Sequence, residues 1–317
     1  MWRPCETLST VRAGTMAVDG FLNALKPAGM TSHDVVAWVR RLVGERRVGH
    51  LGTLDPAAAG VLPLLLGRAT RLFPYAGGPE KAYRAEVVFG TQTDTLDAEG
   101  RVVAEGDAGA LTEGKLESLL HELIGEMEQV PPAFSAAKVD GRPLHERARA
   151  GEAVAGRPKR VTISSLELVE FVGGREARAV IDVVCSTGTY VRVIADDLGK
   201  AAGCGAYLGF LVRTRAGRFA LAEAWTLEEI EVAGDEGRLD ECFLPIDWPL
   251  ERFPEVGIGE REALSFVRGK RICAGKGKAW PVRVYGPGRV FLGLGEVLGE
   301  GMLQPKVVLA SEEAVTA

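Results

Sequence analysis

The sequence predicts an α+β fold (mixed α/β), in which a large N-terminal domain is followed by a small β-barrel-like module. Strand-like and helix-like segments mix without the regular alternation of a doubly wound fold. The 317 residues exceed the usual size of one domain, and a hydrophobic content of 46% is enough to fill a core. Beyond Asp247 the composition changes to short strand-like pieces separated by glycine and proline.

We expect three regions: a disordered extension (1–17), the large domain (18–248) and the barrel-like module (249–317). The extension lacks the continuous apolar centre of a secretory signal, and Met16 is an alternative start. No apolar run reaches the roughly 18 residues that cross a bilayer. The five cysteines are scattered and odd in number, which indicates a reduced, cytoplasmic setting.

The first part of the large domain begins with a predicted helix over residues 32–43. Its valines recur at helical spacing, the hydroxyls of Thr31 and Ser32 suit an N-cap, and the chain leaves the helix through Gly44. Residues 83–89 alternate and are rich in strand formers, which predicts a strand. Residues 90–100 read as a turn-rich loop.

The rest of the large domain is predicted to mix helices and paired strands. Residues 111–125 have a leucine face typical of a helix, and 161–172 and 178–184 look like strands joined near two glycines. Residues 189–194 are expected to be extended, before a helix over 195–202. In the terminal module, the strand-like pieces are 283–285, 290–294 and 306–309.

Basic residues gather in three runs although the formal net charge is −5. This negative net charge argues weakly against binding to a nucleic acid, because phosphate binding depends on lysine and arginine. Solvated surface is the usual explanation of one such run, but three runs flanking candidate sites favour a polyanionic partner. The runs are Arg40, Arg41, Arg46, Arg47, Arg68 and Arg71; Lys138, Arg142, Arg147, Arg149, Arg157, Lys159 and Arg160; and Arg268, Lys270, Arg271, Lys276, Lys278, Arg283 and Arg289.

Asp55 is the first candidate functional residue, at the end of a glycine-rich segment. An aspartate before Pro56 and three alanines is typical of a helix start, so capping is one interpretation. Presentation of the carboxylate to a substrate is the other, and the two are compatible. Asp94 and Asp97 compete with Asp55 as carboxylates, with a solvated turn as their ordinary role.

Tyr190 and Arg192 form a second candidate pair, which period-two alternation would place on one face of a strand. A buried arginine needs a carboxylate partner. Tyr83 is either a half-buried strand aromatic or a platform on which a base stacks. The carboxylates that could pair with Arg192 are Asp55, Asp196 and Asp197.

Metal chemistry is not expected. The four histidines fall at no metal-binding interval, and none has a second histidine four residues on.

The motifs in their order resemble the bacterial tRNA pseudouridine-55 synthase (TruB) family from Gly20 onward. Any one segment is weak evidence, but so many in order are specific. One position departs from the family pattern, because Leu51 stands where threonine is usual. The matching segments are Leu25 to Ser32, Val48 to Pro56, Gly67 to Thr70, Lys81 to Arg84, Gly90 to Asp97, Gln129 to Pro132 with Ser135 and Ala136, Cys185 to Arg192, Asp196 to Gly199, and Leu211 to Thr214.

The resemblance implies a pseudouridine synthase core with a mixed, largely antiparallel sheet and a PUA-like C-terminal RNA-binding domain. It implies an isomerase that converts uridine 55 in the TΨC arm of tRNA to pseudouridine after base flipping, without a cofactor. The implied partner is tRNA, with no membrane and no metal, and we expect a monomer. An RNA-binding or tRNA-folding protein and a guide-dependent synthase are the alternatives.

The resemblance also assigns roles to individual residues. Asp55 is implied as the nucleophile, Arg192 as the cation that holds it ionised and aimed, and Tyr83 as the base-stacking tyrosine. Whether the aspartate attacks the ribose or the base stays open. The implied substrate contacts are His50, Tyr83, Tyr190, Leu211 and Lys26.

Overall fold

A computed structural model describes most of the chain. The extension that the sequence predicts to be disordered, residues 1–17, lies outside the described residues, as do Lys276 and Lys278 of the third basic run. The described residues are 18–135, 137–150, 152, 156–274, 279–298 and 301–316.

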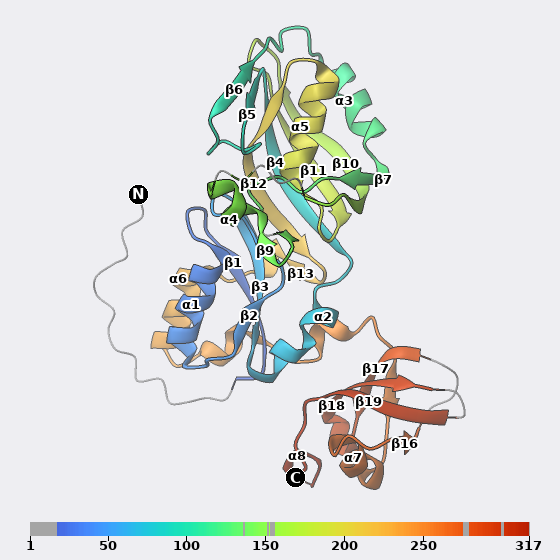
Figure 1. Ribbon diagram of the computed structural model, residues 1–317. Coiled ribbons are helices and arrows are strands. Elements are labelled where there is room, and N and C mark those ends of the chain that lie inside the picture. The colour runs from blue at the N-terminus through green and yellow to red at the C-terminus, as the bar shows by residue number, and fades with distance from the viewer. Residues whose placement is uncertain are drawn as a thin grey trace.

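Helices and strands mix irregularly along the chain (Figure 1), which confirms the predicted α+β class. The helices are α1 (Ser32–Val43), α2 (Phe73–Ala76), α3 (Glu113–Glu122), α4 (Leu144–Arg149), α5 (Val191–Ala202), α6 (Leu227–Asp235), α7 (Glu260–Val267) and α8 (Glu313–Thr316). The strands are β1 (Gly20–Lys26), β2 (Val48–His50), β3 (Ala59–Leu66), β4 (Glu80–Phe89), β5 (Thr91–Thr93), β6 (Val102–Glu105), β7 (Gly125–Gln129), β8 (Lys138–Val139), β9 (Arg142–Pro143), β10 (Lys159–Val172), β11 (Arg178–Ser186), β12 (Ala206–Ala216), β13 (Phe219–Ala220), β14 (Phe243–Leu244), β15 (Glu255–Gly257), β16 (Ile272–Cys273), β17 (Ala279–Tyr285), β18 (Phe291–Val297) and β19 (Met302–Val308).

A ten-stranded sheet forms the body of the large domain. Its main path runs β14-β1-β3-β12-β4-β11-β10-β7, with β2 paired to β3 and β13 paired to β12. The β12–β3 pair is parallel and the other described pairs of this sheet are antiparallel, so the sheet is mixed and largely antiparallel as expected. The predicted partnership of 161–172 with 178–184 is confirmed by the antiparallel ladder of β10 and β11.

Helix α1 has the predicted bounds because its ends are chemically marked. Thr31 and Asp34 form a capping box at its start, and Gly44 ends it in the left-handed conformation at φ 69°. Val35, Val36 and Val39 are buried against the β1 and β3 side of the sheet. The burial of this apolar face stabilises the helix more than its propensity does.

Two sequence predictions near candidate residues are wrong. No helix follows Pro56: residues 55–58 form a turn and β3 begins at Ala59. Strand β3 lies between β1 and β12, and burial within the sheet overrides the helix preference of the alanines. Residues 189–194 are also not extended, because α5 begins at Val191 and buries Val191, Ile194 and Leu198, which stand at helical spacing.

Two further predicted segments are corrected in their bounds or content. The helix predicted over 111–125 is shorter, since α3 starts after the Thr112 cap and Gly125 already belongs to β7. The predicted loop 90–100 contains the short strand β5, which pairs with β6.

The C-terminal module is a five-stranded sheet in the order β15-β17-β18-β19-β16, covered by α7. The three strand-like pieces predicted there fall in or at the edges of β17, β18 and β19. The module also packs on the large domain, because Leu294 and Val307 share a buried cluster with Phe21. Arg68 and Arg71 donate hydrogen bonds from the large domain to backbone carbonyls of residues 309 and 308.

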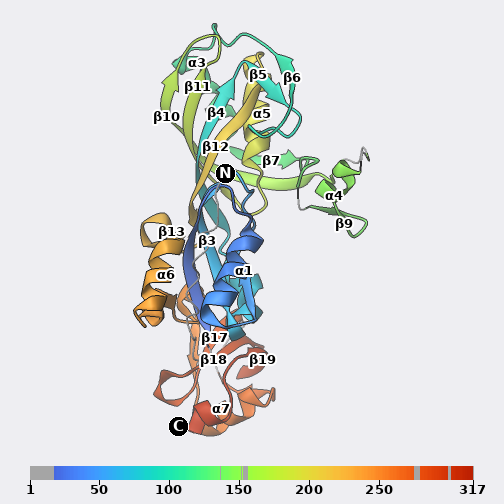
Figure 2. The same ribbon diagram turned by 90° about the vertical axis from the view of Figure 1, so that its left-hand side faces the viewer.

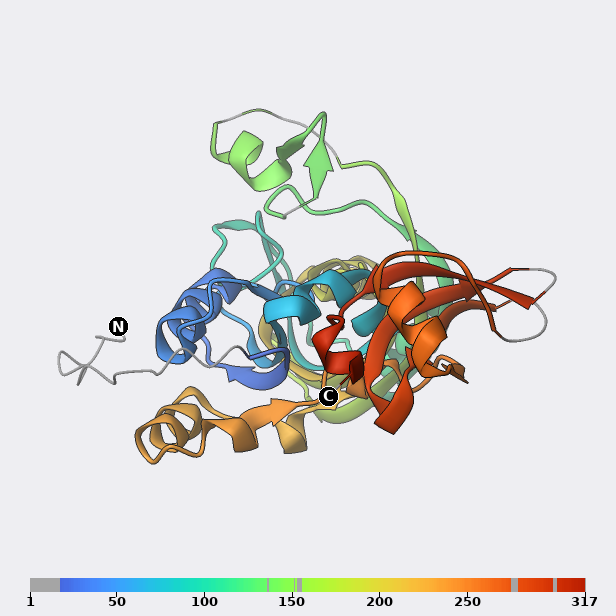
Figure 3. The same ribbon diagram turned by 90° about the horizontal axis from the view of Figure 1, so that it is seen from below.

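The molecule is elongated, with the C-terminal module at one end of the long sheet (Figures 1 and 2). A hairpin and helix made of β8, β9 and α4 project from its side, as Figures 2 and 3 show. None of the helices in the described stretches is long and apolar enough to cross a membrane.

Candidate active site

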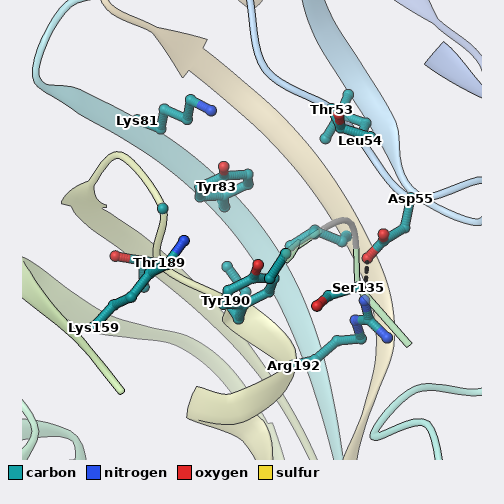
Figure 4. Close-up of a pocket in the computed structure, with 14 residues that line it drawn as sticks. Thr53, Leu54, Asp55, Lys81, Tyr83, Ser135, Lys159, Thr189, Tyr190 and Arg192 are labelled. Carbon is teal, nitrogen blue, oxygen red and sulfur yellow. Dashed lines mark ion pairs between the residues drawn. The ribbon is translucent and has the colours of Figure 1, made fainter. Parts of the chain in front are cut away.

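A cavity of about 300 Å³ opens where the Asp55 loop, strands β4 and β12 and the start of α5 meet. A second cavity of about 310 Å³ lies on the other side of the Asp55–Arg192 pair, between the start of α1 and the 95–99 turn. The first cavity is lined by Thr53, Leu54, Asp55, Lys81, Tyr83, Ser135, Ala137, Lys159, Gly188, Thr189, Tyr190, Val191, Arg192 and Leu211. All of these are drawn in Figure 4, where most are labelled.

The Asp55 side chain points into this cavity from the turn that joins β2 to β3 (Figure 4), and it is 46% exposed. The turn is closed by a hydrogen bond from the Ala58 N–H to the Asp55 carbonyl, 3.1 Å. The buried Ser32 hydroxyl binds both the N–H (2.9 Å) and the carbonyl (3.2 Å) of Leu54. Asp55 therefore closes a rigid turn and caps no helix.

Lys26 is fully buried beneath the Asp55 loop. Its ammonium donates to the carbonyls of Met30 (2.6 Å), Pro27 (2.8 Å) and Pro56 (3.2 Å). Burial lowers the pKa of Lys26 to about 8. The resemblance implies that Lys26 contacts a substrate; in this structure its side chain has no exposed surface and supports the Asp55 loop through the Pro56 carbonyl.

Arg213 supports the same loop from strand β12 and is also fully buried. Its guanidinium donates to the carbonyls of Val61 (2.7 Å), Gly52 (3.0 Å) and Thr53 (3.4 Å). Burial lowers its pKa. The sequence analysis did not select Arg213. The pattern that could have indicated it is an arginine at an inward-facing position of an alternating strand, because a buried guanidinium needs hydrogen-bond acceptors.

Arg192 lies in the first turn of α5 and is 5% exposed. Its guanidinium forms ion pairs with Asp55 at 3.1 Å and with Asp97 at 3.2 Å. It also donates to the carbonyls of Thr95 (3.1 Å) and Phe134 (2.9 Å). The predicted pairing of Arg192 with Asp55 is thus confirmed, on a helix instead of a strand.

The remaining carboxylates have other partners. Asp196 pairs with Lys200 at 2.5 Å and accepts from Gln92 at 2.8 Å, so it is not the partner of Arg192. Asp97 is not a solvated turn residue, because it pairs with Arg192. Asp94 does have the ordinary turn role, since it accepts from the Arg101 N–H at 2.8 Å.

Aromatic and apolar side chains form the wall next to Asp55. Tyr83, from β4, is 7% exposed, and burial raises its pKa although the nearby Arg213 guanidinium acts in the opposite direction. Tyr190 is half-buried, and its N–H donates to the Gln129 side chain at 2.9 Å. Leu211, on β12, completes this wall. The structure therefore brings Asp55, Tyr83, Tyr190, Arg192 and Leu211 to one cavity.

His50 is not among the residues that line either cavity. Its ring packs edge-on against His33, with centroids 5.5 Å apart, and burial lowers its pKa. Its Nδ1 atom is buried without a hydrogen-bond partner in the described part of the chain. His33 itself lines the second cavity. Leu51, which replaces the usual threonine, is buried in the apolar cluster of Phe21, Leu65 and Leu72.

This arrangement can present a partly exposed carboxylate to a flat, partly apolar ligand. A guanidinium with four acceptors fixes the position of the carboxylate, and two tyrosines offer rings at its side. The cavity also contains Lys81, Lys159 and Thr189, which sequence reasoning did not select.

The fold is that of a pseudouridine synthase core with a C-terminal half-barrel domain. A crystal structure of a Cbf5-Nop10-Gar1 complex matches with a TM-score of 0.71 over 93% of this chain and 86% of that chain, at 24% identity. The structure of an H/ACA RNP bound to a substrate RNA containing 2'-deoxyuridine matches with a TM-score of 0.71 at 23% identity, over 93% of this chain and 86% of that chain. At such identities the likeness shows the fold alone.

The chain belongs to the TruB family of pseudouridylate synthases. The model described as TruB family pseudouridylate synthase (N terminal domain) matches residues 40–191. The model of the tRNA pseudouridylate synthase B C-terminal domain matches 192–251, and that of Pseudouridine synthase II TruB, C-terminal, matches 254–309.

Relatives at high identity agree with this assignment. The tRNA pseudouridine synthase B of Symbiobacterium thermophilum is 53% identical over 252 residues, 80% of this chain and 82% of the relative. The proteins of the same name from Caldanaerobacter subterraneus and Thiobacillus denitrificans are each 41% identical, over 92% and 96% of this chain and 99% and 100% of theirs.

Proposed function

We propose that this protein isomerises uridine 55 in the TΨC arm of tRNA to pseudouridine, with Asp55 as the nucleophile and no cofactor. The observation that carries the proposal is the Asp55–Arg192 ion pair of 3.1 Å beside a cavity walled by Tyr83 and Tyr190. The names of the relatives support tRNA as the substrate.

The reaction needs a group that can form and release a covalent bond with the nucleotide. A carboxylate does this without metal help when it is held and aimed. Arg192 supplies the aim from one side, while Lys26 and Arg213 hold the backbone of the Asp55 loop from below. Arg192 and the loop backbone thus hold the Asp55 carboxylate in its reactive position before the substrate binds.

The flipped uracil fits between the tyrosine wall and the Asp55 loop. Stacking on an aromatic ring contributes about 1–3 kcal/mol per base, which is of the size needed to offset the few kcal/mol lost on extruding a base. Because burial raises the pKa of Tyr83, the hydroxyl stays protonated near neutral pH and acts as a hydrogen-bond donor. Leu211 limits the width of the site.

The deciding experiment is incubation of the purified protein with an unmodified tRNA transcript, followed by mapping of pseudouridine. We expect one modified position, uridine 55, without guide RNA or partner protein. Product only with a guide RNA would assign the chain to the guide-dependent class. Binding and refolding of tRNA without product would assign it to the RNA-folding class.

We propose that the C-terminal module contacts RNA through Lys270 and Arg271. Both are exposed and have no carboxylate partner among the residues that the structure describes. Arg268, Arg283 and Arg289 of the same basic run are paired with glutamates, which reduces their use for phosphate.

We expect the double variant Lys270→Gln/Arg271→Gln to bind tRNA about tenfold more weakly at low salt. Each lost phosphate contact reduces the number of counterions that binding releases, and this release favours binding. The slope of log Kd against log salt concentration should fall by about 1.5. Filter binding over a salt series measures both quantities. Arg289→Gln is the matched control, since its charge is already paired with Glu255; an equal effect of the control would contradict the assignment.

A further inference from the structure

Lys81 is a cation of the first cavity to which the proposed mechanism gives no role. Its side chain lies inside the cavity and not at the exposed rim. Strand β4 alternates, so Lys81 and Tyr83 point from the same face of the strand into the cavity (Figure 4). Lys159, the other ammonium of this cavity, is exposed. Lys81 is half-buried beside the Asp55 loop, and a Cβ atom on Gly52 would collide with its Nζ.

No carboxylate pairs with the ammonium of Lys81 in the part of the chain that the structure describes. Across the described residues it makes no hydrogen bond and no ion pair. The charged and titratable groups near it are the Arg213 guanidinium from β12, the Cys185 thiol from β11 and the His50 imidazole from β2. Burial and then the adjacent Arg213 lower the pKa of Lys81 to about 8. Burial also raises the pKa of Cys185, so this neighbour is a neutral thiol near neutral pH.

A desolvated cation next to another cation is costly in the free protein and favours a ligand that brings negative charge. Two parts of a bound nucleotide qualify, namely the backbone phosphate and the oxygen atoms of the uracil. The phosphate of an RNA arm stays at the open mouth, where Lys159 is exposed. The base enters the cavity beside Tyr83, two residues along the strand from Lys81.

We propose that Lys81 is a second catalytic side chain, whose ammonium donates a hydrogen bond to a carbonyl oxygen of the uracil and stabilises the negative charge of the detached base. This inference rests on the proposed function. When the bond between ribose C1' and base N1 breaks, the electron pair remains on the uracil and spreads over N1 and the two carbonyl oxygens. As that bond breaks, the Asp55 carboxylate forms a covalent bond to C1'; C5 then attacks C1' and displaces the carboxylate, the proton on C5 leaves to solvent, and N1 takes up a proton. Lys81 keeps its own protons throughout.

The test compares Lys81→Met with the wild type in single-turnover and steady-state assays on unmodified tRNA. We expect the rate of the chemical step to fall about 100-fold while the Kd for tRNA changes less than about threefold, as for removal of a donor aimed at developing charge. Lys115→Met, an exposed lysine on α3, is the matched control and should keep the wild-type rate. A weaker Kd with an unchanged rate would show a phosphate contact and overturn the inference, as would no change at all.

The pH profile separates a chemical role from a structural one. The ammonium is present below pH about 8 and lost above it, so kcat/KM of the wild type should fall as pH rises through about 8. The profile of Lys81→Met should lack that component, and the two curves should converge above it. Lys26 also has a pKa of about 8, and its contribution cancels because both proteins contain it. Parallel curves would overturn the inference.

Chemical rescue covers the case in which Lys81→Met fails to fold. Lys81→Ala leaves space for a small amine. Added propylammonium should raise the rate of the chemical step in this variant at least about tenfold. Lys81→Gln, which keeps length and polarity, provides the second folded variant, and thermal melting reports the folded state of each. Absence of rescue in folded Lys81→Ala would overturn the inference. A wild type without any pseudouridine product would instead refute the proposed function.

Discussion

Replacement of Asp55 by asparagine is expected to reduce pseudouridine formation by roughly 10⁴-fold or more, because the amide cannot serve as the nucleophile. The shape of the side chain is nearly unchanged, so an amide oxygen can occupy the position of the carboxylate oxygen next to Arg192. The support of the loop by Lys26 and Arg213 uses backbone carbonyls, which the substitution does not touch. The Kd for tRNA should therefore stay within about threefold of the wild-type value.

Asp94→Asn is the matched control for this prediction. Asp94 was a competing carboxylate in the sequence, but it binds the Arg101 N–H in a turn and lines neither cavity. Its variant should keep the wild-type rate in a tritium-release or mapping assay. Turnover by Asp55→Asn, or loss of turnover in Asp94→Asn, would move the nucleophile away from Asp55.

Replacement of Arg192 by methionine is the second large change, with an expected fall of about 10²–10³-fold in kcat. The guanidinium is the only group in the described structure that joins the Asp55 and Asp97 carboxylates, and it also binds two carbonyls. Without it the two carboxylates would repel each other and Asp55 would lose its aim, and a displacement of about 1 Å can cost 100-fold in rate. Single-turnover kinetics on tRNA measure the effect.

Stability should change in the same variant, because Asp97 and the carbonyls of residues 95 and 134 lose a buried partner. The free energy of unfolding should fall by about 2–4 kcal/mol, as for a broken buried ion pair. Arg178→Met is the matched control, since Arg178 pairs with Glu86 and Glu176 but lies on the surface. Denaturant unfolding gives the comparison; equal losses in the two variants would contradict the structural role of Arg192.

A large part of the fold was predictable from local patterns. Helix α1 carries its own start and end signals, with Thr31 and Gly44 as caps, and the prediction of its bounds is confirmed. The β10–β11 pair was predictable because two strand-forming runs flank a short glycine turn. That a strand and not a helix follows Asp55 was not predictable in this way. The alanines after Asp55 favour a helix, and only the burial of β3 between β1 and β12 makes the segment a strand.

The candidate site was predictable as a set of residues but not as a structure. Motif order alone selected Asp55, Tyr83 and Arg192, and all three lie on one cavity. Tyr190 and Arg192 were predicted to lie together through the alternation of a strand, and this prediction was wrong. Helix α5 begins at Val191, and its first turn brings Arg192 to the cavity. The resemblance implies a substrate contact for Lys26, and the structure shows that its fully buried ammonium donates to backbone carbonyls, which no motif records.

The sequence by itself predicted the fold class and the family, and the resemblance to that family pointed to Asp55 with Arg192, because these predictions depend on residue types in a fixed order. Only the tertiary structure decided that Asp97 shares Arg192, that Arg213 and Lys26 support the Asp55 loop, and that Lys81 lies in the cavity with no carboxylate partner among the residues described. Those contacts join residues from 30 to 161 positions apart. Burial and the pairing of distant strands create them, and no local pattern carries that information.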